Sequence, residues 1–338
     1  MVIRLFIVSF AENCGVQMNG RLEYVDIAKG MGIVLVVCSH SDALGLMWLF
    51  MGMFVPIFYF CAGYTFTMKG TLKDSMKKRF RKLFVPYVFF NLLLFVCFLH
   101  FSLRELLGMF YSRYCLYPLD VEPNVKFLTS GNYPMWFLTS MILSYLFFYL
   151  IVYHEKYRYA FIVVYALVTQ AFVYSPILLP WSLDTAFLTA LFMYAGMMAR
   201  CRDAMAWSGW AFLLMAVLYV ALHLVAGDMN LSVRMYGHSF VSYFLLGTMG
   251  SLLVMKLSMW MQQTWGGRLF LLLGRHSLTI FCIQILFIFH AKSLFAWLFP
   301  GGTVGYLAGI FEIVAALVGG LLVSLLIHRS RLLSRLLL

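Results

Sequence analysis

Three residues that could do chemistry lie in a stretch with the composition of a membrane-spanning helix: Asp26, Lys29 and His40. His40 follows Lys29 by eleven positions, almost three whole turns of helix, so both side chains are expected on one helical face, with Asp26 within about 40° of it. A charged residue in hydrocarbon costs roughly 2.5–3.5 kcal/mol, so it usually faces a partner or a water-filled cavity. This polar stripe is therefore the first candidate site.

His40 is the candidate catalyst of the stripe. A histidine that titrates near neutral pH can take a proton from a hydroxyl and deliver it to a leaving group. Ser39, Ser41 and Asp42 flank it, which indicates a polar, water-lined end of the helix. Asp42 is a candidate orienter of the imidazole, although residues two apart on a regular helix do not face each other. The alternative is a packed histidine bonded to a neighbouring helix.

Lys29 and the basic segment 69–82 are candidate anion contacts. For Lys29 the alternative is snorkelling to the membrane interface, and Asp26, three residues earlier, is expected to be its structural partner. Arginine suits bidentate phosphate contacts and lysine acts as a point charge, so the segment could hold a polyphosphate. Anchoring on the inner membrane surface explains it equally well. No Gly-rich phosphate loop of the common types is present.

Two further residues are candidates for the acceptor side. Glu312 is an isolated carboxylate in an apolar segment and should have a partner. Trp136 opens an apolar segment at its outer end, where an aromatic belt is the plain interpretation and a platform for a sugar ring is the sharper one.

The elements that position these residues are expected to be transmembrane helices. The chain has 338 residues, of which 63% are hydrophobic and 11% charged, whereas soluble domains carry about 25% charged residues. Segments that are apolar all round favour helices over an alternating barrel. The sequence predicts an all-α polytopic membrane protein with about ten spans: 26–46, 48–68, 83–103, 134–153, 159–178, 181–199, 205–226, 239–257, 269–289 and 305–327.

The distribution of basic residues predicts the orientation. With ten spans, most lysines and arginines fall in inner loops, above all in 69–82, so both termini are expected in the cytoplasm. The net charge of +12 is therefore an orientation signal and does not indicate nucleic acid. Residues 1–20 are expected to be a cytoplasmic tail, with Met18 as an alternative start, and 331–338 a second tail. The seven scattered cysteines indicate no disulfide framework and no metal site.

The chain resembles the acyltransferase 3 family of membrane proteins, in particular its fucose 4-O-acetylase-like branch. The resemblance is carried by an ordered set of motifs across residues 21–330: RLEYVDIAKGMGIVLVVCSH (21–40), FVPIFYFCAGYTF (54–66), KKRFRKLFVPY (77–87), MWFL (135–138) and LGRHSLTIF (273–281). No single motif is specific, and the order of the set carries the similarity.

This resemblance implies a bacterial inner-membrane enzyme that moves an acetyl or other short acyl group from acyl-CoA to a sugar hydroxyl of a cell-envelope or exported polysaccharide. His40 would correspond to the catalytic histidine, acting either as base or as acyl carrier. Lys29 would replace an arginine found in many members, and Arg79, Arg81 and Lys82 would contact the acyl-CoA phosphates. Gln284 stands where the family often has a histidine.

The expected partners are acyl-CoA as co-substrate, a polysaccharide or lipid-linked glycan, and the bilayer, with no bound cofactor and no metal. The rival hypothesis is a polytopic transporter or exporter of a glycan or lipid-linked sugar, with the stripe lining its path. A third hypothesis is a non-catalytic sensing or scaffold protein, in which His40 and Lys29 could be substituted without loss of function.

Overall fold

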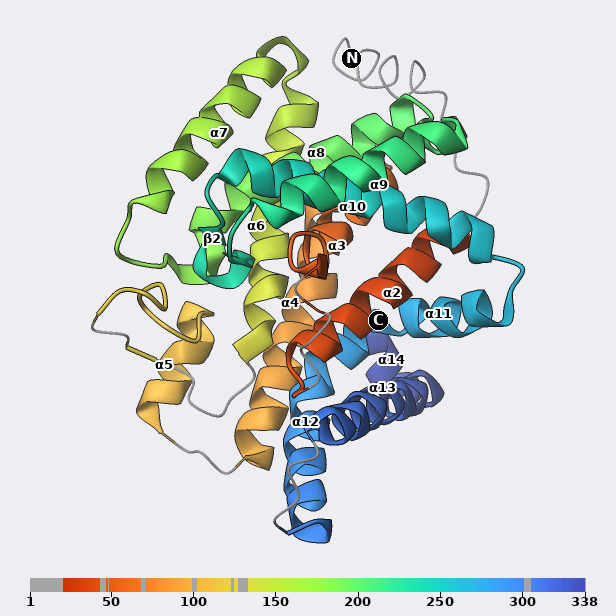
Figure 1. Ribbon diagram of the computed structural model, residues 1–338. Coiled ribbons are helices and arrows are strands. Elements are labelled where there is room, and N and C mark those ends of the chain that lie inside the picture. The colour runs from red at the N-terminus through yellow and green to blue at the C-terminus, as the bar shows by residue number, and fades with distance from the viewer. Residues whose placement is uncertain are drawn as a thin grey trace.

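The computed structural model describes residues 21–42, 47, 49–67, 71–98, 102–122, 125–126, 133–300 and 305–337. The predicted tail 1–20 lies outside these residues. The described part is almost wholly helical and contains one small antiparallel hairpin, β1 (Met229–Asn230) with β2 (Met235–Tyr236), so the predicted all-α class is confirmed (Figure 1). The helices are α2 (Glu23–Ser39), α3 (Pro56–Tyr64), α4 (Leu72–Cys97), α5 (Leu103–Tyr111), α6 (Trp136–Tyr153), α7 (Arg158–Val173), α8 (Leu183–Cys201), α9 (Gly209–Leu224), α10 (Phe240–Met261), α11 (Trp265–Arg275), α12 (Ser277–Leu298), α13 (Gly305–Arg329) and α14 (Arg331–Leu337).

Six helical segments of the described chain are long and apolar enough to cross a membrane. They are Leu72–Cys97, Tyr133–Tyr153, Pro180–Cys201, Phe240–Met261, Ser277–Leu298 and Gly305–Arg329. Helix α9 is apolar but shorter. A multi-pass membrane protein is thereby supported, while the count of about ten spans and the cytoplasmic position of both termini stay predictions.

Several predicted boundaries differ from the structure. The first predicted span, 26–46, contains a helix that ends at Ser39, and the second, 48–68, contains the nine-residue α3. The basic segment predicted as a loop is helical from Leu72, because lysine and arginine are good helix formers and the Thr71 hydroxyl accepts from the Asp74 amide at 3.1 Å to cap the helix. The last-but-one predicted span, 269–289, is broken at His276 between α11 and α12.

Helix α2, which carries the polar stripe, is packed on several sides. It contacts α3, α10, α11, α12 and α13 (Figure 1). Its approach to α11 is backbone to backbone, since a Cβ on Gly30 would overlap the carbonyl of Phe270 and a Cβ on Gly274 would overlap that of Asp26. Glycine permits this close approach because it has no side chain. The stripe is therefore presented by a rigidly held helix.

The apolar core of the described residues has two large clusters and a small third one around Cys115, Leu178 and Val233. One contains Trp136, Leu231 and Tyr243 with much of α3 and α8. The other contains Val36 and Phe281 with parts of α4 and α12. Residues of both clusters line the same cavity, so the cavity lies where the two clusters meet.

Candidate functional site

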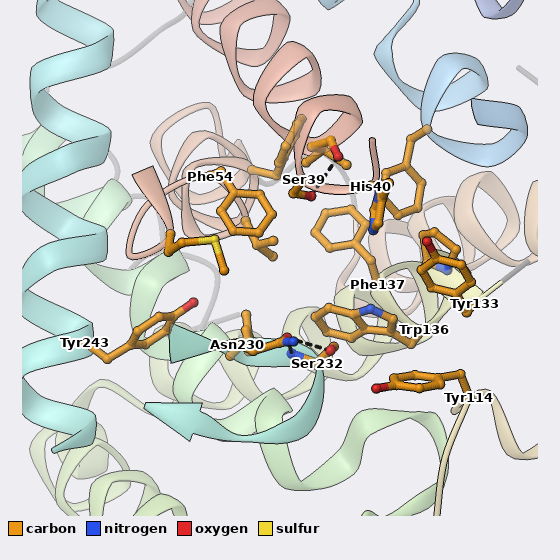
Figure 2. A pocket seen from close by; sticks show the side chains of 17 residues that line it. Ser39, His40, Phe54, Tyr114, Tyr133, Trp136, Phe137, Asn230, Ser232 and Tyr243 are labelled. Atoms are coloured by element: carbon orange, nitrogen blue, oxygen red, sulfur yellow. Dashed lines mark hydrogen bonds between the residues drawn. The ribbon is translucent and has the colours of Figure 1, made fainter. Parts of the chain in front are cut away.

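His40 lies at the C-terminal end of α2, where the helix stops. Its backbone N–H donates to the Val37 carbonyl at 3.1 Å, and Ser39 Oγ donates to the Val36 carbonyl at 2.8 Å, so the polar side chains close the last turn. The imidazole borders a cavity of about 330 Å³. Figure 2 shows His40, Trp136 and Asn230 around this space. Ending the helix at this point places the imidazole at the edge of an open volume.

The cavity wall is aromatic and uncharged. Its rings come from several segments of the chain: Phe54 and Phe58 lie before and in α3, Tyr114 follows α5, and Trp136 begins α6. Tyr243 of α10 and Phe281 of α12 complete the aromatic wall. Among the described residues that line it, none is Asp, Glu, Lys or Arg. Its polar groups are serines, tyrosines, Asn230 and His40 itself. Aromatic walls with a few polar groups are typical of sites for small organic ligands.

Two tyrosines stand near the histidine end of this wall. The Tyr133 ring meets the His40 ring edge to face, with 5.3 Å between centroids, and lies 6.1 Å from the Tyr114 ring. Burial, with the neighbouring Cys115 thiol as the next cause, raises the pKa of the Tyr114 phenol. Tyr114 is therefore a neutral hydrogen-bond donor or acceptor and cannot act as a base at ordinary pH.

Asp42 has other partners than His40. Lys292 Nζ lies 2.6 Å and 2.9 Å from the two Asp42 carboxylate oxygens, and the Asp42 amide donates to Glu312 Oε2 at 3.0 Å. Glu312 is fully buried and does not line the cavity. Asp42, predicted to orient His40, and Glu312, predicted to contact the acceptor, therefore contact each other. Together with Lys292 they connect the end of α2 to α12 and α13.

The other end of the stripe lies away from the cavity. Lys29 Nζ is 3.6 Å from Asp26 Oδ1, and the buried Asp26 carboxylate also pairs with Arg21. Neither Lys29 nor Asp26 lines the cavity. At 1.5 Å per residue, Lys29 and His40 are about 16 Å apart along α2. The stripe therefore connects two separate polar regions.

Of the three basic residues predicted to contact phosphates, only Arg79 turns inward. Its guanidinium donates to Tyr149 Oη at 3.1 Å and to Tyr145 Oη at 3.0 Å, and its Cζ lies 4.5 Å from the Tyr145 ring centroid. Arg81 and Lys82 are exposed on α4. Within the described residues, no carboxylate forms a salt bridge with any of these three cations.

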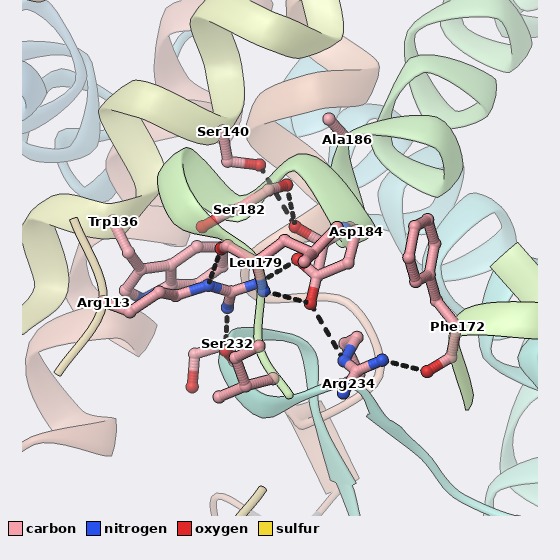
Figure 3. A network of polar contacts seen from close by, with 12 residues as sticks. Arg113, Trp136, Ser140, Phe172, Leu179, Ser182, Asp184, Ala186, Ser232 and Arg234 are labelled. Atoms are coloured by element: carbon pink, nitrogen blue, oxygen red, sulfur yellow. Dashed lines mark hydrogen bonds and ion pairs between the residues drawn. The ribbon is translucent and has the colours of Figure 1, made fainter. Parts of the chain in front are cut away.

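A buried ionic cluster beside the cavity was not predicted from the sequence. The Asp184 carboxylate pairs with Arg113 and, at 2.9 Å, with Arg234 Nε (Figure 3). Arg113 also donates to the Ser232 carbonyl and lies 6.0 Å from the Trp136 ring centroid, and both Ser232 and Trp136 line the cavity. We call Arg113, Asp184 and Arg234 the arginine–aspartate clamp. The signal available was the isolated acid Asp184, which needs a cation among apolar residues.

The described residues contain no group of three or more His, Cys, Asp or Glu side chains placed to hold a metal ion. The expectation of a metal-free reaction stays a prediction.

Comparison with known protein families gives a match that covers all the residues of the candidate site. A family model described as an acyltransferase domain matches residues 22–329. The match includes the polar stripe, the clamp and every residue that lines the cavity. No curated protein and no solved structure matches the chain.

Proposed function

Because this chain belongs to the acyltransferase domain family, acyltransferase 3, and is in general terms a membrane acyltransferase, we propose that it moves an acetyl or other short acyl group from acyl-CoA to a sugar hydroxyl of a cell-envelope or exported polysaccharide. The observation that carries this proposal is the position of His40, which borders an aromatic cavity that no charged side chain of the described residues lines. An imidazole there is the group best suited to proton transfer.

In the proposed reaction, His40 removes the proton of the acceptor hydroxyl as the oxygen attacks the thioester carbonyl carbon. The new C–O ester bond forms, the C–S bond breaks, and the CoA sulfur takes the proton from the imidazolium. Transfer through an acyl-imidazole uses the same residue as a nucleophile, followed by attack of the hydroxyl on the acyl group. Both routes require the hydroxyl, the thioester and His40 within the one cavity.

The donor is proposed to enter from the end of the stripe that carries Lys29. Lys29, with Arg79, Arg81 and Lys82, would hold the phosphates of acyl-CoA, and Asp26 would keep Lys29 in place. The roughly 16 Å between Lys29 and His40 suits an extended donor arm that carries the thioester to the cavity while its phosphates stay outside. The contacts of Arg79 support this role, because tyrosine hydroxyls bind its guanidinium and no carboxylate of the described residues neutralises its charge.

The acceptor is proposed to bind against the aromatic wall, with Trp136 as the platform for the sugar ring. A polysaccharide or lipid-linked glycan would approach from the outer side of a bacterial inner membrane, which is the localisation we propose. The reaction needs acyl-CoA as co-substrate and no bound cofactor. Asp42 and Glu312 are assigned a structural role, because their contacts are with each other and with Lys292.

The proposal is tested by reconstituting the protein in liposomes with radiolabelled acetyl-CoA and a polysaccharide acceptor. We expect label on the glycan from the unaltered protein and none from His40→Ala. The matched control is His290→Ala, which removes an exposed imidazole of α12 that does not line the cavity. This variant should transfer the acyl group at the normal rate.

Undiminished transfer by His40→Ala would remove this residue from the chemistry. Movement of labelled glycan across the liposome membrane without acyl-CoA would instead favour the transporter hypothesis. Mass spectrometry of the surface polysaccharide from a deletion strain then identifies the acyl group and the acceptor, because the missing mass increment distinguishes acetyl from succinyl.

A further inference from the structure

Gln284 is a buried polar residue near His40 that makes no hydrogen bond in the described part of the chain. It lies in α12, its side chain is fully buried, and neither its amide nitrogen nor its amide oxygen has a partner. Its amide is close enough to His40 to act on the imidazole, yet the geometry falls short of a hydrogen bond. His40 Nδ1 is also buried and without a partner.

This arrangement is unfavourable for a residue that only fills space. A buried amide that makes no hydrogen bond keeps the desolvation penalty of its polar atoms, and an apolar side chain of the same shape avoids it. Unsatisfied buried polar groups in native proteins therefore call for an explanation, and catalytic sites are where they are expected. The neighbouring Asp42 carboxylate pairs with Lys292 and makes no hydrogen bond to His40 Nδ1 in the structure.

We propose that Gln284 is the positioning residue of His40. Its amide oxygen accepts the Nδ1–H of the imidazole, which leaves Nε2 without a proton and free to act on the acceptor hydroxyl. The Gln284 amide has no other hydrogen-bond partner among the described residues. The Val36 carbonyl also lies near the imidazole, and it already accepts from Ser39 Oγ at 2.8 Å. This inference rests on the proposed function, in which His40 takes the hydroxyl proton.

The direction of the bond matters for the chemistry. If the amide nitrogen donated to Nδ1, the proton of the neutral ring would sit on Nε2, and the ring could not accept another proton toward the cavity. With the oxygen accepting, the same bond strengthens when the ring becomes an imidazolium, because hydrogen bonds to charged groups are the stronger ones. The amide thus stabilises the protonated intermediate without adding a second ionised group.

The test compares Gln284→Met with Gln284→Glu. Methionine is unbranched and of similar length but makes no strong hydrogen bond, so kcat should fall about 10- to 100-fold, the rate equivalent of one hydrogen bond to a charged group. The KM values for acyl-CoA and acceptor should not change. The thermal unfolding midpoint should stay the same or rise, because two unsatisfied polar atoms are removed. Glutamate keeps an accepting oxygen at the same reach and should restore most of kcat.

The control is Thr279→Val, which removes another buried polar group of α12 away from the cavity and should leave kcat unchanged. An unchanged kcat in Gln284→Met, with His40→Ala inactive, would overturn the positioning role and leave the proposed function standing. A lowered unfolding midpoint with a matching loss of active protein would make Gln284 structural. If the unaltered protein transfers no acyl group, the proposed function fails and this role fails with it.

Discussion

The arginine–aspartate clamp, which contacts the cavity-lining Ser232 and Trp136, and the His40–Gln284 pair, whose imidazole lines the cavity, are two buried polar groups that differ in how their polar atoms are satisfied. In the clamp every nitrogen of Arg113 donates a hydrogen bond, and Asp184 also accepts from the amides of Leu179 and Thr185. In the pair, three buried polar atoms have no partner in the described chain. The contrast distinguishes residues that hold the cavity wall from the pair that we propose acts in the cavity.

The backbone around the clamp supports this division. Ser112, Trp181, Ser182 and Arg234 all have φ between 56° and 61°, a conformation that costs non-glycine residues about 1–3 kcal/mol and persists only where surrounding contacts enforce it. These residues flank Arg113 and Asp184 in the sequence or belong to the clamp. The clamp therefore fixes three segments: the chain after α5, the turn before α8 and the β1–β2 hairpin. Two of them, through Tyr114 and Ser232, contribute to the cavity wall.

The largest effect on stability is expected for Asp184→Ala. Removing the carboxylate leaves two guanidinium groups buried with no counter-charge, and breaking a buried ion pair in this way costs about 3–5 kcal/mol. The thermal unfolding midpoint in detergent, followed by size-exclusion chromatography after heating, should fall strongly. The control is Asp228→Ala, which removes an exposed carboxylate just before β1. Equal midpoints for the two variants would show that the clamp does not stabilise the wall.

An intermediate effect is expected for Arg234→Met. The variant keeps the pair of Arg113 with Asp184, now one cation to one anion, and loses the bonds from Arg234 to the carbonyls of Phe172, Ser175 and Ile177. Unsatisfied acceptors cost about 1–3 kcal/mol, so the midpoint should lie between those of the unaltered protein and Asp184→Ala. The kcat of the folded fraction should be unchanged, because His40 is untouched. A midpoint below that of Asp184→Ala would contradict the charge argument.

The sequence singled out His40 as a candidate site residue but did not predict the arginine–aspartate clamp. His40 stood out because a polar stripe in an apolar helix is costly, and the structure places its imidazole at the cavity at the end of α2. Its catalytic role stays a prediction. Trp136, predicted from its place at the start of an apolar segment, lines the same cavity. The spacing of polar residues along one helix was sufficient to single out His40, because that pattern lies within a short stretch of sequence.

The clamp and the Asp42 contacts could not be derived in this way. Arg113 and Asp184 are separated by 71 positions, and Asp42 and Glu312 by 270, so nothing local pairs them. Hydropathy also misplaced helix ends, because α2 stops at polar Ser39 while apolar residues continue beyond it. Arg113 lies outside every predicted span, yet its side chain is buried. Long-range pairing of charges needs the tertiary structure.

The smallest effect on stability is expected for Lys292→Met. This variant tests whether the Asp42 carboxylate has only a structural role or also acts on His40. The Lys292 and Asp42 side chains are 58% and 47% exposed, so their ion pair should contribute less than about 1 kcal/mol, and the amide of Asp42 keeps its bond to Glu312. We expect an unfolding midpoint within a few degrees of the unaltered protein, less difference at high salt, and an unchanged kcat. The control is Lys156→Met, which removes an exposed lysine between α6 and α7 that does not line the cavity. A kcat that changes by tenfold or more in Lys292→Met, but not in the control, would show that the Asp42 carboxylate acts on His40. Asp42 would then belong with His40 and Gln284 among the residues proposed to take part in the reaction.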